Sequence, residues 1–262
     1  MLRYAPIIVG ATAGVLYIRE RRARIAIERL GAATLETLLN AIDANNPETG
    51  AHVRRVAAYS LILAKAADCE EHQQRSVERV ALFHDIGKID GALIDIVNQS
   101  TKLAPHERRA IKTHPRLGAT VLDPLASFYP DLPAGVMAHH ERWDGSGYPR
   151  GLRARHIPLA ARIVAIADTF DAVTHSRPYH GPQSARKAVE VLSAARGTQF
   201  DPDLVDLFVS EPVLEEVCEK MKKALAPRRR GGKRKGRPET KDAPDITFRW
   251  RTTTPLQQTA DR

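Results

Sequence analysis

The chain has 262 residues, 43% of them hydrophobic and 27% charged, which fits one domain of about 200 residues with flanks or two smaller domains. This apolar content excludes a wholly disordered chain, and 16 Gly with 17 Pro exclude a collagen-like repeat. Two cysteines, Cys69 and Cys218, are too few for a disulfide framework or a cysteine-rich zinc cluster, which indicates a reducing, cytoplasmic setting.

The formal net charge of +9 is concentrated at the two ends of the chain. Residues 1–30 hold six Arg and two Glu, and residues 227–262 hold eleven Lys or Arg and four Asp or Glu. Residues 31–226 hold 23 basic and 25 acidic residues together with all ten histidines. A slightly acidic, histidine-rich body indicates ligands for cations rather than a nucleic-acid surface, so nucleic acid is not an expected partner.

The N-terminal segment of residues 1–30 is an apolar stretch followed by a basic flank. Residues 4–18 (YAPIIVGATAGVLYI) carry no charge, and an arginine cluster begins at Arg19. A helix of this length reaches roughly 22 Å, and snorkelling of Arg3 and Arg19 would help it to cover the roughly 30 Å hydrocarbon core. We expect a membrane anchor here, with the following domain on the cytoplasmic side; a buried N-terminal helix is the alternative.

Residues 31–225 read as helices with short breaks and form the predicted domain. Hydrophobic residues recur every three or four positions, strand-like alternation is absent, and Pro202 and Pro212 suit the first turn of a helix. The predicted helical segments are 51–67, 77–83, 134–137, 159–173, 184–195 and 204–209. The fold class is therefore predicted to be all-α, a compact helical bundle.

Residues 226–262 form a strongly basic tail punctuated by Gly and Pro, with few large apolar residues. Such a composition predicts disorder. Two functional explanations stay open: a solvated tail without a specific role, or an electrostatic arm for anionic lipid or nucleic acid.

The strongest chemical signal is the pair His84 and Asp85, which ends an apolar helical run. A buried histidine next to a buried aspartate is costly unless the two are hydrogen-bonded or bind a metal. Further candidates are Glu48, His52, His114, His139, His140 and Asp168. Each one alone has an ordinary structural explanation, such as a cap or an arginine partner. Together they supply nitrogen and oxygen ligands for at least two metal ions.

The ordered series of motifs resembles the HD-GYP family, a branch of the HD phosphohydrolase superfamily. The resemblance covers about residues 34–210, and its most specific block is AHHERWDGSGYPRGL at 138–152. The other matching stretches are PETGAHVRR (47–55), LFHDIGK (82–88), KTHPRLGATVL (112–122), IPLAARIVAIADTFDAVT (157–174), RPY (177–179) and GTQFDP (197–202). The resemblance implies an HD-type helical bundle.

The resemblance also implies a metal-ligand set. The matching residues are His52, His84, Asp85, His114, His139, His140 and Asp168. Asp85 matches a carboxylate that bridges two metals, and Glu48 matches an extra ligand found in members with a third metal. The expected cofactors are therefore two or three divalent ions, with iron or manganese favoured.

Substrate contacts follow from the same resemblance. Lys88 matches a lysine at the substrate phosphate and, with Asp85, is a predicted catalytic residue. Arg177 matches an arginine that contacts the dinucleotide, and Gly147, Tyr148 and Pro149 form the namesake motif, in a loop that Asp144 is expected to order. Family members hydrolyse cyclic di-GMP to pGpG, and in some cases to GMP, through a metal-activated hydroxide.

Two departures from the family pattern concern the substrate. The loop at 89–101 lacks the usual turn sequence, and His180 stands where the family often has a lysine for the dinucleotide. A histidine still hydrogen-bonds phosphate but is mostly neutral at pH 7. Alternatives to cyclic di-GMP hydrolysis are therefore hydrolysis of another cyclic dinucleotide or nucleotide, or a non-catalytic scaffold that holds partners at the Gly147–Pro149 loop or the basic tail. With about 30 residues before the domain, regulation is expected through the N-terminal segment, the tail or a partner.

Overall fold

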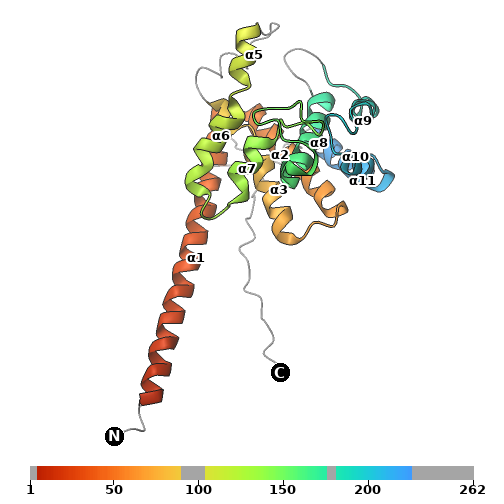
Figure 1. The fold of residues 1–262 in the computed structure, drawn as a ribbon. Helices are drawn as coiled ribbons and strands as arrows, with labels where there is room; N and C mark the ends of the chain where they lie inside the picture. The colour runs from red at the N-terminus through yellow and green to blue at the C-terminus, as the bar shows by residue number, and fades with distance from the viewer. Residues whose placement is uncertain (1–4, 90–103, 176–180, 226–262) are drawn as a thin grey trace, which may run out of the picture. The chain divides into compact units, whose positions relative to one another are not determined.

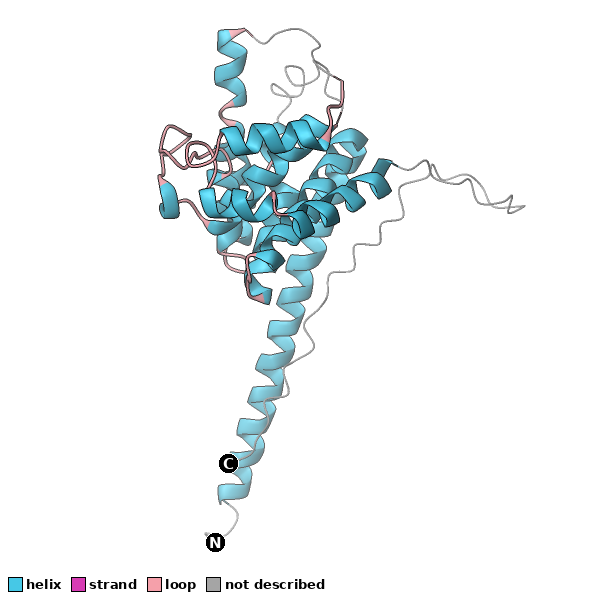
Figure 2. Cartoon of the chain, turned by 90° about the vertical axis from the view of Figure 1, so that its right-hand side faces the viewer, coloured by secondary structure: helices cyan, strands magenta, loops and turns pink. Residues whose placement is uncertain are grey.

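The computed structural model describes residues 5–89, 104–175 and 181–225, which fold into helices joined by short loops (Figure 1). These residues contain no β-strand, as the colouring of Figure 2 shows, and the all-α prediction is confirmed. The residues from Thr37 to Ala226 form one compact unit. The domain limits predicted at residues 31 and 225 stay predictions.

Helix α1 (Ala5–Asn45) is one continuous helix of 41 residues. It continues through the arginine cluster that begins at Arg19, so the apolar run and the basic flank belong to the same element. None of the helices within the described residues is both long and apolar enough to cross a membrane. The membrane anchor predicted for residues 4–18 is not supported, because the uncharged run is only 15 residues long and charged residues follow it within the same helix.

The centre of the compact unit consists of α2 (Pro47–Ala66), α3 (Glu71–Phe83) and α8 (Leu159–Thr174). Helix α2 starts earlier than predicted because Asn46 caps it: the Asn46 side chain accepts hydrogen bonds from the backbone N–H groups of Glu48 and Thr49. The buried residues include Val53, Val56, Tyr59, Leu63, Val77, Val80, Ile163, Ile166 and Phe170. Their spacing of three or four residues is the amphipathic pattern that the sequence predicted.

The remaining helices are α5 (Pro105–Ile111), α6 (His114–Leu122), α7 (Asp131–Ala138), α9 (Ala185–Ala194), α10 (Pro202–Phe208) and α11 (Glu211–Leu225). Helices α7, α9, α10 and α11 pack against this centre, and α6 packs against α7. Short 3-10 helices are η1 (Ile86–Ile89), η2 (Asp123–Leu125) and η3 (Ala154–His156). Helix α8 has the predicted start and extends one residue beyond the predicted end, whereas α7 begins three residues before its predicted start.

A glycine allows η1 to approach α6 closely. A Cβ atom added to Gly87 would lie 2.1 Å from the carbonyl oxygen of His114 and 2.6 Å from the backbone nitrogen of Gly118. Only glycine leaves room for this backbone-to-backbone approach. The contact brings Asp85 and Lys88, on either side of Gly87, next to the start of α6.

Candidate metal centre

Helix ends bring the predicted ligands together. His84 is the C-cap of α3, His139 is the C-cap of α7, and His114 begins α6 directly after α5. His52 lies within α2 and Asp168 within α8. The side chains of His52, His84, Asp85, His114 and His139 are all buried. Residues from five separate helices and the α3–η1 junction thus converge on one place.

The ligand atoms form two groups that adjoin at Asp85. In the first group, His52, His84 and Asp85, and in the second, His114, His139 and His140, the atoms lie within 4.8 Å of one another. Asp85 Oδ2 is 3.5 Å from His84 Nε2, and Asp85 Oδ1 is 3.4 Å from His114 Nε2. The two oxygens of one carboxylate therefore face the two groups.

Asp168 lies beside the first group. Its Oδ1 is 3.3 Å from His52 Nε2 and 4.0 Å from His84 Nε2. All seven residues of the predicted ligand set, apart from the extra Glu48, therefore gather in the two groups or next to them.

Backbone carbonyls fix the orientation of three of the histidines. Nδ1 of His84, His114 and His139 lies 2.6–2.8 Å from the carbonyl oxygen three residues earlier in the chain. These carbonyls belong to the last turns of α3, α5 and α7, where carbonyl groups lack a partner within the helix. Because a carbonyl only accepts, Nδ1 carries the proton, and Nε2 presents its lone pair to the site.

This donor set fits divalent metal ions. His114 Nε2 and His139 Nε2 are 3.1 Å apart, so two lone pairs face each other in a buried place. Two nitrogens bound to one metal at about 2.1 Å and at angles of about 90–109° stand roughly 3.0–3.4 Å apart. His84 Nε2 is also buried and makes no hydrogen bond to the described residues. One cation in each group would satisfy these nitrogens.

The ionisation of Asp85, His114, His139 and His140 suits metal binding, whereas Asp168 and Asp171 outweigh burial and raise the pKa of His52. Burial lowers the pKa of His114 to about 4 and that of His140 to about 3, and it holds the pKa of His139 well below its ordinary value. Burial by itself would raise the pKa of Asp85, but Lys88 and the neighbouring histidines outweigh it and hold the pKa well below its usual range. Neutral imidazoles and an ionised carboxylate are the forms that bind metals.

Lys88 and the Gly147–Pro149 loop border the two groups. Lys88 Nζ lies 2.7 Å from Asp85 Oδ2. The ring of Tyr148 stacks on that of His140 with centroids 4.9 Å apart, and the Tyr148 N–H donates to the His140 carbonyl. The Tyr148–Pro149 peptide bond is cis. Of the predicted substrate residues, Lys88 and Tyr148 thus lie against predicted metal ligands.

Two carboxylates hold the loop that carries the Gly147–Pro149 motif. Asp144 Oδ1 accepts hydrogen bonds from the N–H and Oγ of Ser146, as expected for a loop-ordering residue. Glu141 is buried and accepts from the N–H groups of Arg150 and Leu152. Sequence reasoning missed Glu141, although its place directly after the histidine pair was a signal.

Asp171 is a second missed residue. Its fully buried carboxylate contacts His52, Arg55 and His175. The available signal was its position three residues after Asp168, one turn further along α8.

Other predicted residues do not join the site. Glu48 is exposed in the first turn of α2 and belongs to neither group, so the described residues give no support for a third metal. Arg177 and His180 lie outside the described residues, as do residues 90–101 of the divergent loop.

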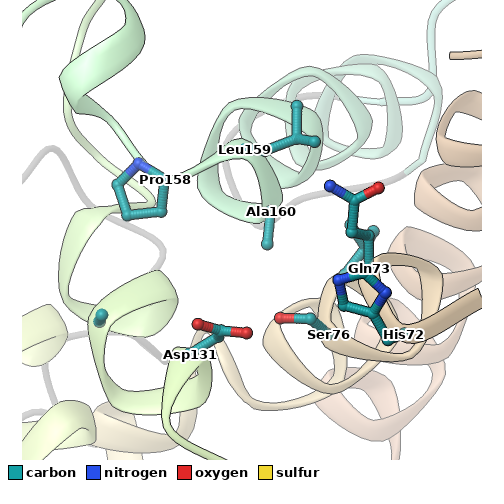
Figure 3. A pocket seen from close by; sticks show the side chains of 9 residues that line it. His72, Gln73, Ser76, Asp131, Pro158, Leu159 and Ala160 are labelled. Atoms are coloured by element: carbon teal, nitrogen blue, oxygen red, sulfur yellow. The ribbon is translucent and has the colours of Figure 1, made fainter. Parts of the chain in front are cut away.

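A separate cavity of about 310 Å³ lies between the first half of α3, α7 and the start of α8 (Figure 3). His72, Ser76 and Asp131 are among its lining residues. His72 precedes His84 by twelve residues, which is about 18 Å along a helix. None of the metal-ligand candidates lines this cavity, so it is not the predicted site.

The fold and these side chains together define an all-α protein with two adjoining groups of histidine and aspartate residues of the kind that hold metal ions. Residues 36–204 match the family model described as HD domain, and the chain belongs to this family. The family prediction is confirmed.

Relatives whose names state an activity are cyclic dinucleotide phosphodiesterases. The chain is 37% identical to the cyclic di-GMP phosphodiesterase response regulator RpfG of Xanthomonas campestris pv. campestris, over 76% of this chain and 53% of the relative. It is also 37% identical to the 3'3'-cGAMP-specific phosphodiesterase 2 of Vibrio cholerae serotype O1, over 66% of this chain and 33% of the relative. The chain thus spans about half or less of the length of these relatives.

A solved structure confirms the fold. The cyclic GMP-AMP specific phosphodiesterase V-cGAP3 of V. cholerae superimposes with a TM-score of 0.54 at 22% identity, covering 74% of this chain and 50% of the other. At this identity the likeness concerns the fold alone.

Proposed function

We propose that the chain is a metal-dependent phosphodiesterase that hydrolyses cyclic di-GMP to pGpG and onward to GMP. The observation that carries the proposal is Asp85, whose two carboxylate oxygens face two separate groups of buried histidine ligands. Such an arrangement suits a pair of metal ions that share one carboxylate. The name of the relative from X. campestris supports the choice of substrate.

We propose that two divalent ions bind. The mixture of imidazole and carboxylate ligands suits iron, manganese or zinc, and the family resemblance favours iron or manganese. The proposed ligands are His52, His84, Asp85 and Asp168 for one ion and Asp85, His114, His139 and His140 for the other. When bound, such ions lower the pKa of water and neutralise charge on phosphate oxygens.

The residues of the chain then bind and orient the substrate. Lys88 holds its ammonium group 2.7 Å from Asp85, which places a positive charge at the edge of the site for a phosphate oxygen. Tyr148 covers His140 and closes the site on that side. We propose that Arg177 and His180 make further phosphate contacts.

A second candidate substrate is 3'3'-cGAMP. Three relatives from V. cholerae are named 3'3'-cGAMP-specific phosphodiesterases, and one is as identical to this chain as the first-mentioned relative. The divergent loop at 89–101 and His180 both alter predicted substrate contacts, which favours a test of this alternative.

The experiment uses the full chain loaded with Fe²⁺ or Mn²⁺ under reducing conditions. Cyclic di-GMP and 3'3'-cGAMP are supplied separately, and the products are separated by chromatography. We expect pGpG and GMP from cyclic di-GMP; faster turnover of 3'3'-cGAMP would select the second candidate. No turnover of either substrate with either metal would refute both and favour a scaffold that binds a protein partner at the Gly147–Pro149 loop.

A matched pair of variants links the activity to the site. Asp85→Ala is expected to abolish turnover, whereas His72→Ala, which removes an exposed histidine far from the ligand groups, is expected to retain it. Equal activity in the two variants would refute the assignment of the site.

A further inference from the structure

Asp171 is a buried residue, and both oxygens of its carboxylate contact basic side chains. Oδ2 lies 2.7 Å from His52 Nδ1 and accepts a hydrogen bond from an Arg55 terminal nitrogen at 2.9 Å. Oδ1 accepts from Arg55 Nε at 2.7 Å and lies 3.1 Å from His175 Nδ1. Its side chain is 1% exposed. So many charged contacts on a fully buried carboxylate require an explanation beyond packing.

The position of His52 explains why it needs a side-chain partner. His84, His114 and His139 use carbonyl groups that helix ends leave unpaired. His52 lies within α2, where carbonyl groups accept hydrogen bonds from their own helix. Only another side chain can then accept the Nδ1–H of His52, and Asp171 is the acceptor at hydrogen-bond distance.

The contact determines which nitrogen of His52 faces the site. With Nδ1 bound to Asp171, Nε2 points to Asp168 Oδ1 at 3.3 Å and to Asp85 Oδ2 at 3.9 Å. Arg55 lies one turn after His52 on α2, so α2 supplies both the ring and the guanidinium that hold Asp171 on α8. The ring is therefore fixed in both tautomer and direction.

We propose that Asp171, held by Arg55, is a positioning residue that prepares His52 to bind a metal ion in the first ligand group. The inference rests on the proposed two-metal function and extends it to a residue outside the ligand set. Asp171 makes no contact of this kind with His114, His139 or His140 in the described part of the chain. The two groups should therefore differ in their dependence on Asp171.

The test is metal binding by the full-length Asp171→Asn variant. Metal-free protein is titrated with Co²⁺, with affinity followed by calorimetry and ligation followed by the visible absorption of bound Co²⁺. Loss of such a supporting partner typically lowers metal affinity about 10–100-fold. We expect this loss for one of the two equivalents, while the other keeps its affinity and spectrum.

Asp206→Asn is the matched control. Asp206 also receives two hydrogen bonds from one arginine, Arg196, but this pair is on the surface. We expect wild-type binding of both equivalents in this variant. Unchanged affinities in folded Asp171→Asn would overturn the proposal, as would an equal loss of both equivalents, which a merely structural role would produce.

If circular dichroism shows that Asp171→Asn does not fold, a second variant tests the proposal. Arg55→Gln keeps the Asp171 carboxylate but removes the guanidinium that holds it. We expect a weaker loss of affinity at the same single equivalent, and unchanged binding would overturn the proposal. A wild-type chain that binds two metals but turns over no cyclic dinucleotide would refute the proposed function. The metal titration would still test the role of Asp171.

Discussion

Gly87→Ala is expected to damage the metal centre without touching a ligand. The new Cβ would lie 2.1 Å from the His114 carbonyl oxygen, whereas ordinary contacts begin at 3.4 Å. Relief of this contact alone requires η1 and α6 to separate by about 1.3 Å, and both partners are backbone atoms that cannot rotate away. Metal–ligand distances tolerate about 0.2 Å. The Asp85 and His114 ligands would then no longer face one ion.

The expected stability loss follows from the same distances. Overpacking of this kind costs about 1–3 kcal/mol. For a domain of this size, that is a decrease in Tm of about 2–12 °C. The assay is thermal unfolding of metal-free protein, followed by Mn²⁺ titration of the folded variant.

The control for this prediction is Gly181→Ala, because a Cβ added to Gly181 meets no atom of the described residues within 4 Å. We expect its Tm and Mn²⁺ affinity to stay close to wild type. If Gly87→Ala also keeps wild-type Tm and Mn²⁺ affinity, the reasoning from the close approach of η1 and α6 is refuted.

Three further predictions concern the charged groups of the site. Lys88→Ala should keep the wild-type metal content but lose turnover, because Lys88 approaches Asp85 without being a ligand; metal analysis and initial rates check this, and loss of both would contradict it. Asp85→Ala should lose metal and turnover together, which the same measurements decide. In the metal-free protein, burial lowers the pKa of His114 from 6.5 to about 4, so the unfolded chain binds more protons at intermediate pH. Stability is then full above pH 6.5 and falls by on the order of 3 kcal/mol as the pH decreases to about 4. Urea unfolding at pH 7 and pH 4.5 measures the difference, and equal midpoints would argue against it.

The structure brings the predicted ligand candidates together, whereas several residues around them were not foreseen from the sequence. His84 and Asp85 end an apolar helical run, and this local pattern survives folding because α3 ends there. The position of Glu141 after the histidine pair indicated a place near the site but not its role, because its partners are backbone N–H groups nine and eleven residues away in a loop. Asp171 and His52 are 119 positions apart, and only the packing of α2 on α8 joins them.

The N-terminal helix was predicted too short for a different reason. The change from apolar to arginine-rich composition at Arg19 suggested a boundary, but no residue there breaks a helix. Arginine, alanine and leucine all favour helix, so the backbone continues to Asn45 despite the change in polarity. Glu48 shows the limit of the family resemblance: the resemblance implied an extra metal ligand, but the residue is exposed and belongs to neither ligand group.

Helix ends organise most of the metal centre. At the ends of α3, α5 and α7, carbonyl groups that would otherwise need water accept the Nδ1–H of a histidine. A shift of one residue in any of these ends would turn the histidine by about 100° around the helix axis and break that hydrogen bond. The positions of these ends are thus as important to the site as the histidines. His52 is free of this constraint because it lies within a helix, and the site depends there on the carboxylate of Asp171 instead.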